Sequence, residues 1–473
     1  MSTDTGVTDT GATGSVSAPA QRSALAAHVW PASAQLTGPS STLSIGGLDS
    51  AVLAAEFGTP AFIIDEDHFR ARARLFVDSF TEAFAGIGTG VDVYYAGKSF
   101  LSVAIAKWAR EEGLAIDTCS GGELAVAERA GVPGAAIGLH GNNKSRAEIA
   151  RAIDLGVGRI VADSLWEIDL IAELALAAGR TAANPVPVMV RVTTGIHAGG
   201  HEFISTATED QKFGLSLAGG QALTGLALVL SHPQLRLLGA HAHIGSQIQD
   251  ATAFELNARK MLVLRQELAQ QTGFLMPELD LGGGYGIAYT PGETPIDVPA
   301  LARSLAATVG AVAAELGTTV PRISIEPGRS IVGPTTITLY EVGTVKPVTI
   351  EDGTVRTYVS VDGGMSDNLR PMLYGAQYTA RLANRAGSEQ GILARVVGKH
   401  CESGDILISE IYLPADVRAG DLVAVAATGA YGRSMASNYN NLLKPPVVAV
   451  RAGKGHVIVR RETEADLLAL DVG

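Results

Sequence analysis

Eight short apolar runs alternate with helical segments through the middle of the chain, and this rhythm constrains the fold more than any other feature of the sequence. The helical segments carry one apolar face, as between Leu301 and Leu316, where Leu and Val recur at steps of three and four residues. Eight strand–helix units in roughly 260 residues predict a closed (β/α)8 barrel, or TIM barrel, over residues 66–332. The expected strands are 91–96, 114–118, 136–140, 159–162, 186–192, 235–243, 278–281 and 322–326.

The pattern changes on both sides of the expected barrel. From 333 to 473 short alternating strands follow one another, for example 335–342 and 447–450, which predicts a C-terminal β-sandwich or barrel-like domain. Residues 1–28 begin with a stretch rich in Ser, Thr, Gly and Ala, and this composition predicts a disordered tail rather than a targeting signal. The chain is therefore expected to be an α/β protein with two ordered parts.

Composition excludes several classes of function. The 473 residues, 47% of them hydrophobic, are enough for two cores, and no apolar run is long enough to span a membrane. With 36 basic and 48 acidic residues the net charge is -12, which opposes binding to nucleic acid or to an anionic membrane and favours a small-molecule substrate. Cys119 and Cys401 are the only cysteines, so we expect neither a disulfide framework nor a cysteine-based metal site, and a reducing cytoplasm fits.

One lysine stands at the end of the first barrel strand. The run 92–100 is rich in the Val and Tyr typical of strands and delivers Lys98 just past the strand's end. A lysine held among apolar neighbours has a lowered pKa and can attack a carbonyl to form a Schiff base, which is how pyridoxal phosphate (PLP) is anchored. Taken alone, Lys98 is better explained as a solvated lysine in a loop, and only the other strand ends favour the functional interpretation.

Polar and glycine-rich motifs follow three other strands, at the end where a TIM barrel places its active site. They are the segments 241–247 (HAHIGSQ), 282–286 (GGGYG) and 326–330 (EPGRS). Each segment taken alone has a purely structural explanation: a histidine in the core, a flexible turn of glycines, and a carboxylate that ends a strand. Because the last strand of a barrel lies beside the first, however, Glu326 and Lys98 can face one ligand. A carboxylate beside a pyridine nitrogen keeps that nitrogen protonated, and glycines let backbone N–H groups approach a phosphate.

Together these motifs resemble those of PLP-dependent decarboxylases of the alanine racemase-like barrel class, most closely the diaminopimelate decarboxylases of the actinobacterial type. The resemblance covers residues from about 29 to 472. It implies that Lys98 forms the Schiff base with PLP, that His243 stacks on the cofactor ring and that Glu326 pairs with the pyridine nitrogen. The implied phosphate-binding residues are Ser246, Gly283, Gly284, Gly328 and Arg329. In this family residues near the N-terminus, here 29–65, join the C-terminal β-domain.

The resemblance also assigns roles to three motifs in the C-terminal part, at 362–374, 398–405 and 429–432. Cys401 and Glu402 would reach into the neighbouring subunit's site, which implies a homodimer with shared active sites. Cys401 would either help to protonate the carbanion or form a passive wall. Cys119 follows the second strand on the face that carries Lys98, so the two cysteines could lie close together across the interface. The implied substrate-binding residues are Arg329, Arg370, Tyr374, Glu402 and Tyr431, the last of which also touches the cofactor.

The activity implied by this resemblance is conversion of meso-2,6-diaminopimelate to L-lysine and CO2, the last step of lysine biosynthesis, in the cytoplasm. Glu402 would bind the distal ammonium and an arginine the distal carboxylate, which argues against ornithine or arginine as the substrate. Two alternatives remain open: another PLP-dependent amino-acid or carboxypolyamine decarboxylase of the same fold, and a non-catalytic PLP-binding protein. An alanine racemase would need a tyrosine as a second base, and a glutamate at the pyridine nitrogen argues against it.

Overall fold

The computed structural model describes residues 25–196 and 212–473, so nearly all of the expected tail lies outside the described residues. Eight parallel strands form a barrel that closes where β8 pairs with β9, and β13 lies beside β5 with Ile325 opposite Val93. The predicted TIM barrel is therefore confirmed. The strands are β5 (Val91–Ala96), β6 (Ala115–Thr118), β7 (Ile137–Leu139), β8 (Arg159–Ala162), β9 (Val186–Thr193), β11 (Leu235–His241), β12 (Glu278–Asp280) and β13 (Arg322–Ile325), with β10 (Leu215–Ser216) added at the edge of β9.

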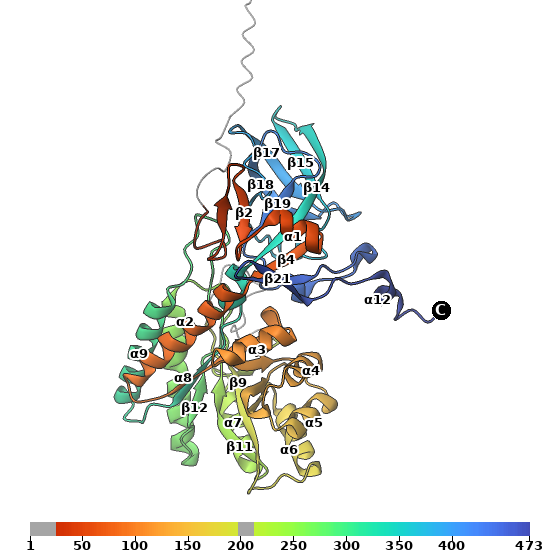
Figure 1. Ribbon diagram of the computed structural model, residues 1–473. Helices are drawn as coiled ribbons and strands as arrows, with labels where there is room; N and C mark the ends of the chain where they lie inside the picture. The colour runs from red at the N-terminus through yellow and green to blue at the C-terminus, as the bar shows by residue number, and fades with distance from the viewer. Residues whose placement is uncertain (1–24, 197–211) are drawn as a thin grey trace, which may run out of the picture.

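Helices surround the barrel because each turns one apolar face towards it. The helix over 298–315, for example, buries the apolar residues that recur along its sequence. Several helices begin at a serine whose hydroxyl accepts a hydrogen bond from a backbone N–H of the first turn, as Ser102, Ser120, Ser145 and Ser164 do. The helices are α2 (Glu66–Ala85), α3 (Val103–Glu111), α4 (Gly121–Arg129), α5 (Arg146–Leu155), α6 (Leu165–Ala177), α7 (Gln221–Ser231), α8 (Ala251–Thr272) and α9 (Val298–Glu315) (Figure 1).

A second, mixed sheet is built from both ends of the chain, which confirms the predicted C-terminal β-domain. Its long strand β14 (Thr336–Thr349) pairs with β15, β19 and β4 (Ala61–Asp65), and β4 pairs on its other side with β20. β14 continues past its predicted end at Val342 because pairing with β15 outweighs the interruption of the apolar pattern at Gly343 and Pro347. The other strands are β15 (Val355–Val361), β16 (Ala380–Leu382), β17 (Gly391–Val397), β18 (Ile406–Pro414), β19 (Leu422–Val425), β20 (Val447–Arg451) and β21 (Lys454–Val459).

Shorter elements complete the fold. Figure 1 shows the second sheet above one end of the barrel, with the small sheet of β1 to β3 beside it. The remaining elements are β1 (Gln35–Thr37), β2 (Thr42–Ile45), β3 (Leu48–Asp49), α1 (Ser50–Phe57), α10 (Arg329–Val332), α11 (Arg370–Tyr374) and α12 (Glu464–Leu468). Within the described ranges, none of the helices has the length and apolar character that crossing a membrane requires.

Candidate active site

Lys98 lies in a single 3-10 turn, Gly97–Ser99, directly after β5. The turn is anchored from within the barrel, where the hydroxyl of Ser99 donates to the carbonyl of Ala96 at 2.8 Å. It is anchored from the C-terminal part as well, because the backbone N–H of Tyr431 donates to the carbonyl of Ser99 at 2.9 Å. Two halves of the chain therefore fix the position from which the lysine side chain projects.

Two adjoining cavities meet at Lys98. The first has a volume of about 260 Å³, and the second, of about 550 Å³, opens towards the second sheet. Lys98 and His243 line both of them. The first cavity is lined by carboxylates and imidazoles, including Asp117, His140, His241 and Glu326, and by one arginine, Arg191. The second is lined by arginines and tyrosines, including Tyr289, Arg329, Arg370, Tyr374 and Tyr431. The site is therefore elongated, with chemically different ends on either side of one amine.

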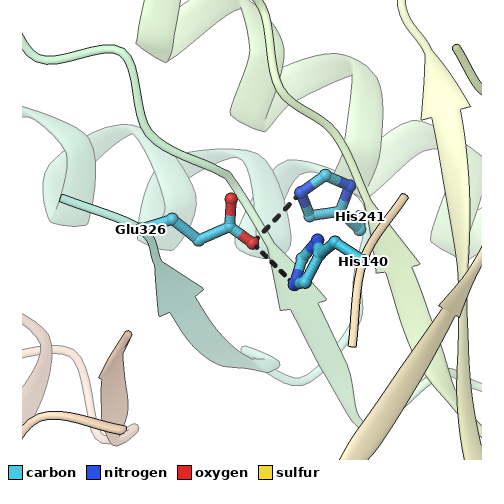
Figure 2. A group of neighbouring side chains, drawn as sticks. All are labelled: His140, His241 and Glu326. Atoms are coloured by element: carbon cyan, nitrogen blue, oxygen red, sulfur yellow. Dashed lines mark ion pairs between the residues drawn. The ribbon is translucent and has the colours of Figure 1, made fainter. Parts of the chain in front are cut away.

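Glu326 is at the centre of the carboxylate and imidazole end. Its Oε1 lies 3.3 Å from Nε2 of His140 and 3.2 Å from Nε2 of His241, and all three side chains are buried. Figure 2 shows the two rings approaching the same oxygen. Burial acts to raise the pKa of Glu326, but His140, His241 and Lys98 outweigh it and hold that pKa well below its ordinary value. Glu326 is therefore an anion.

A second carboxylate lies next to this group. Oδ1 of Asp117 is 3.3 Å from Nε2 of His140. Burial, together with the charge of Glu326, raises the pKa of Asp117 well above its ordinary value. Burial likewise lowers the pKa of His140 well below its ordinary value, so its imidazole is neutral. The cluster thus concentrates one negative charge on Glu326.

The protonation of Lys98 differs from the expectation based on its sequence. Burial does lower the pKa of Lys98, but Tyr431, Asp117 and Glu326 raise it further, so that the net direction is upward. The prediction of a lowered pKa is wrong, because it considered only the apolar neighbours in the strand. The groups that decide the charge of this amine come from other strands and from the C-terminal part.

His243 is held by the glycine segment that follows β12. Its Nδ1 accepts a hydrogen bond from the backbone N–H of Gly283 at 3.1 Å, which assigns the ring proton of a neutral imidazole to Nε2. Burial, with Lys98 and Arg191 nearby, lowers the pKa of His243 well below its ordinary value. The glycines let this segment lie close to the end of β13, since a Cβ at Gly283 would lie 2.2 Å from the carbonyl oxygen of Glu326. A neutral, oriented ring therefore borders both cavities.

The other end of the site contains two arginines. Nη2 of Arg329 donates to the hydroxyl of Ser246 at 2.7 Å, and its Nη1 donates to the hydroxyl of Tyr289. The guanidinium of Arg329 also lies over the ring of Tyr431, at 4.7 Å from its centroid. Arg370, at the start of α11, is buried and lies 4.6 Å from the centroid of the Tyr289 ring. This end can bind phosphate or carboxylate groups.

Comparison with known proteins agrees with this geometry. The pyridoxal-binding domain of the pyridoxal-dependent decarboxylases matches residues 67–333. The diaminopimelate decarboxylase of Mycobacterium tuberculosis is 48% identical over 455 residues, which are 95% of this chain and 98% of the relative. That of Corynebacterium efficiens is 47% identical over 95% of both chains.

The chain belongs to the diaminopimelate decarboxylases. The solved diaminopimelate decarboxylase of M. jannaschii in complex with L-lysine has the same fold, with a TM-score of 0.85, 30% identity and coverage of 93% of this chain and 98% of that one. Enzymes of this family are PLP-dependent lyases, and PLP is therefore the cofactor of this decarboxylase.

The site of this diaminopimelate decarboxylase fits PLP. Buried polar atoms of Glu326, His140 and His241 line the cavity next to Lys98, where they face one another at 3.2 Å and 3.3 Å and make no well-aligned hydrogen bond to any described residue. An anionic carboxylate suits a pyridinium nitrogen, and the amine of Lys98 suits the aldehyde. Arg329 and Ser246 are close enough to bind one phosphate together, whereas the N–H of Gly283 is already donated to His243. The predicted phosphate contacts of Gly283, Gly284 and Gly328 remain predictions.

Two predicted residues are not brought to Lys98 within one chain. Cys401 is exposed, and neither it nor Glu402 is among the residues that line the two cavities in the described part of the chain. Their loop is fixed by Asp405, which accepts a hydrogen bond from the backbone N–H of His400 at 2.9 Å. Cys119, by contrast, does line the first cavity. The closeness of the two cysteines across a subunit interface remains a prediction.

Three polar residues of the site were not identified from the sequence, and a fourth, His241, was noted only as part of the motif after the sixth barrel strand, without a role. Asp117, His140, Arg191 and His241 lie within two residues of the C-terminal ends of β6, β7, β9 and β11 and line the first cavity. The rule that barrel enzymes place their active residues at these ends could have found them. It was applied only where glycines or a lysine marked the strand end, and single polar residues did not stand out.

Proposed function

We propose that the two cavities around Lys98 form the site at which this diaminopimelate decarboxylase holds PLP and converts meso-2,6-diaminopimelate to L-lysine and CO2. The observation that carries this proposal is the position of Lys98 between an anionic carboxylate at one end and two arginines at the other. Such an arrangement suits a cofactor with a pyridine nitrogen and a phosphate, and a substrate with two carboxylates. In this reaction PLP, when bound, supplies an electron-withdrawing ring that accepts the electron pair left behind by CO2.

The residues at the cofactor have distinct tasks. Lys98 would hold the aldehyde and yield it to the substrate amine, and Glu326 would pair with the protonated pyridine nitrogen. His243, neutral and fixed by Gly283, would cover one face of the ring without adding a positive charge. Ser246 and Arg329 would hold the phosphate, because their side chains already lie within hydrogen-bond distance of each other. The backbone N–H groups of Gly284 and Gly328 would complete that contact, and Gly283, whose N–H is donated to His243, would let the chain approach the phosphate closely.

The substrate would be recognised at the arginine end. Arg370 and Tyr374, both on α11, line the larger cavity with Arg329 and Tyr431 and would bind a carboxylate of diaminopimelate. Glu402 and Cys401 would enter this cavity from a second copy of the chain, with Glu402 on the distal ammonium and Cys401 near the carbon that gains the proton. Their exposed loop supports this role, and the functional unit would then be a homodimer.

We also propose a division of labour along the chain, with a PLP-binding barrel at 66–332 and a β-domain made of 29–65 and 333–473. The pairing of β4 with β14 and β20 supports it. We expect the enzyme to work in the cytoplasm, where both cysteines would stay reduced. Cell fractionation with an antibody to the chain would test this location.

The activity is tested by supplying purified, PLP-loaded enzyme with meso-diaminopimelate and measuring CO2 and L-lysine. L-ornithine and L-arginine, offered at the same concentration, serve as comparison substrates. We expect turnover on meso-diaminopimelate alone, because the basic side chains of the comparison substrates would leave the arginines without a second carboxylate. Faster release of CO2 from either comparison substrate would contradict the proposal.

A further inference from the structure

Two imidazoles from different strands converge on one oxygen of Glu326. His241 is the last residue of β11, and His140 follows β7 directly. Their Nε2 atoms lie 3.2 Å and 3.3 Å from Oε1 of Glu326. The rings meet edge to face, with centroids 5.0 Å apart and planes at 76°. In Figure 2 the second carboxylate oxygen points away from both rings. The carboxylate is thus approached on one oxygen only.

The backbone positions from which both imidazoles project are fixed by the barrel. His241 is paired within the barrel with Asp280 of β12 and Arg191 of β9. The backbone N–H of His140 donates to the carbonyl of Thr118, at the end of β6, at 2.7 Å. Both rings therefore start from the rigid wall of the barrel rather than from a mobile loop. Side chains placed in this way are suited to orient a third group.

We infer that His140 and His241 are positioning residues, which hold Oε1 of Glu326 so that its other oxygen faces the pyridine nitrogen of PLP and keeps that nitrogen protonated. The inference rests on the proposed role of Glu326. At 3.2 Å and 3.3 Å the contacts are slightly long for hydrogen bonds, and polar contacts of this kind commonly tighten when the ligand is bound. Two contacts that tighten on the same oxygen would oppose rotation of the carboxylate away from the ring.

Two N–H donors also decide the charge of the carboxylate. A buried carboxylate without partners takes up a proton, and it could then no longer favour a pyridinium. Asp117 competes for His140 at 3.3 Å, but burial and the charge of Glu326 raise the pKa of Asp117, so Glu326 is the anionic acceptor of the two. Loss of either imidazole should therefore change the protonation of the pyridine nitrogen, in addition to any effect on folding.

The test compares two amide substitutions at each position. Gln carries its amide nitrogen close to where Nε2 of histidine stands, whereas Asn carries it close to where Nδ1 stands. Asn and Gln carry the same amide group and differ only in the length of the side chain. Each of the variants H140N, H140Q, H241N and H241Q is first treated with a chelator. This step removes any bound metal ion, since the side-chain atoms of His140, His241 and Glu326 that could bind one lie within 4.8 Å of one another. Each variant is then loaded with PLP labelled with nitrogen-15. H232N, which changes an exposed histidine 3.0 Å from Asp169, serves as the control.

Two readouts separate positioning from a structural role. The nitrogen-15 chemical shift reports whether the pyridine nitrogen is protonated, and titration of the apoenzyme gives the dissociation constant for PLP. We expect the Asn variants to lose the pyridinium signal and to bind PLP about tenfold more weakly, because each loses one donor to a charged acceptor. The Gln variants and H232N should keep the wild-type signal. The melting temperature of each apoenzyme verifies that it is folded.

Each outcome distinguishes this inference from the function on which it rests. A wild-type enzyme whose pyridine nitrogen is unprotonated would overturn the role of Glu326, and the inference with it. A wild-type pyridinium that persists in both Asn variants would overturn only the role of the histidines. If an Asn variant does not fold, the Asn and Gln variants of the other histidine decide, because loss of the signal in Asn alone supports positioning. Loss of the signal in a folded Gln variant contradicts it.

Discussion

Replacing Glu326 by Gln should leave the shape of the site intact and reverse the polarity of one contact. In the wild type, Oε1 faces the imidazoles of His140 and His241 at 3.3 Å and 3.2 Å. The amide oxygen of Gln is the only atom that can accept from those two N–H groups, so its NH2 group must turn towards the pyridine nitrogen. An amide donor there favours the unprotonated ring, which is a weaker acceptor of electrons.

The size of the effect follows from the charge that is lost. A hydrogen bond to a charged group contributes about 1.5–3 kcal/mol, and the E326Q variant loses the anion that supports charge development on the ring. We therefore expect kcat to fall at least about 100-fold, which corresponds to about 2.7 kcal/mol in the barrier. The assay is release of L-lysine and CO2 at saturating meso-diaminopimelate, with bound PLP quantified after denaturation. Retention of PLP together with near-normal kcat would refute the reasoning. E315Q, an exposed glutamate paired with Arg259 at 3.0 Å, is the control for the substitution.

Three further predictions address other parts of the molecule. Lys98→Ala should abolish both lysine formation and the attachment of a pyridoxyl group by borohydride, and attachment at another lysine with normal turnover would contradict the assignment. Mixing inactive K98A with inactive E402A, followed by subunit exchange, should restore about one working site per heterodimer if Glu402 acts on the partner's substrate, and a mixture that stays inactive counts against a shared site. Burial lowers the pKa of His68 to about 4, below its unfolded value of 6.5, so the stability that its neutral ring contributes is lost as pH falls from about 6.5 through 4. H68N, whose side-chain oxygen can still accept from the backbone N–H of Ala32, should show a smaller drop in melting temperature between pH 7 and pH 4.5, and an equal drop would exclude this role.

The sequence alone predicted the barrel well because its strands are buried on both faces. β5 and β8 have the predicted bounds, and the others differ by one or two residues at an end, as expected where hydrogen bonding rather than apolar character decides where a strand stops. The continuation of β14 past Gly343 was not predicted, since its second half is stabilised by β15 and not by an apolar face. The local pattern of apolar residues therefore predicted strands that are buried in the core. It did not predict the part of β14 that is extended only by hydrogen bonding to β15.

The site was predicted less completely than the fold. Glu326 and Lys98 line one cavity, as expected, because barrel closure makes their strands neighbours through the pairing of β13 with β5. His140 and Asp117 were not recognised, because a single polar residue at the end of an apolar run has no distinctive local pattern. The pKa of Lys98 was predicted to shift downward, whereas the structure raises it, because the groups that raise it are distant in the sequence. Convergence of isolated residues is a property of the closed barrel and is not encoded in any one segment.

The position of β4 has a consequence for how the protein forms during synthesis. β4 is made before the barrel, yet both strands that flank it, β14 and β20, are made after it. While the ribosome is still translating the barrel, the edges of β4 have no partner strand and need protection from other chains. The backbone bond from Tyr431 to the turn of Lys98 forms at the same late stage. The turn that carries Lys98 therefore gains its contact with the C-terminal part only near the end of translation.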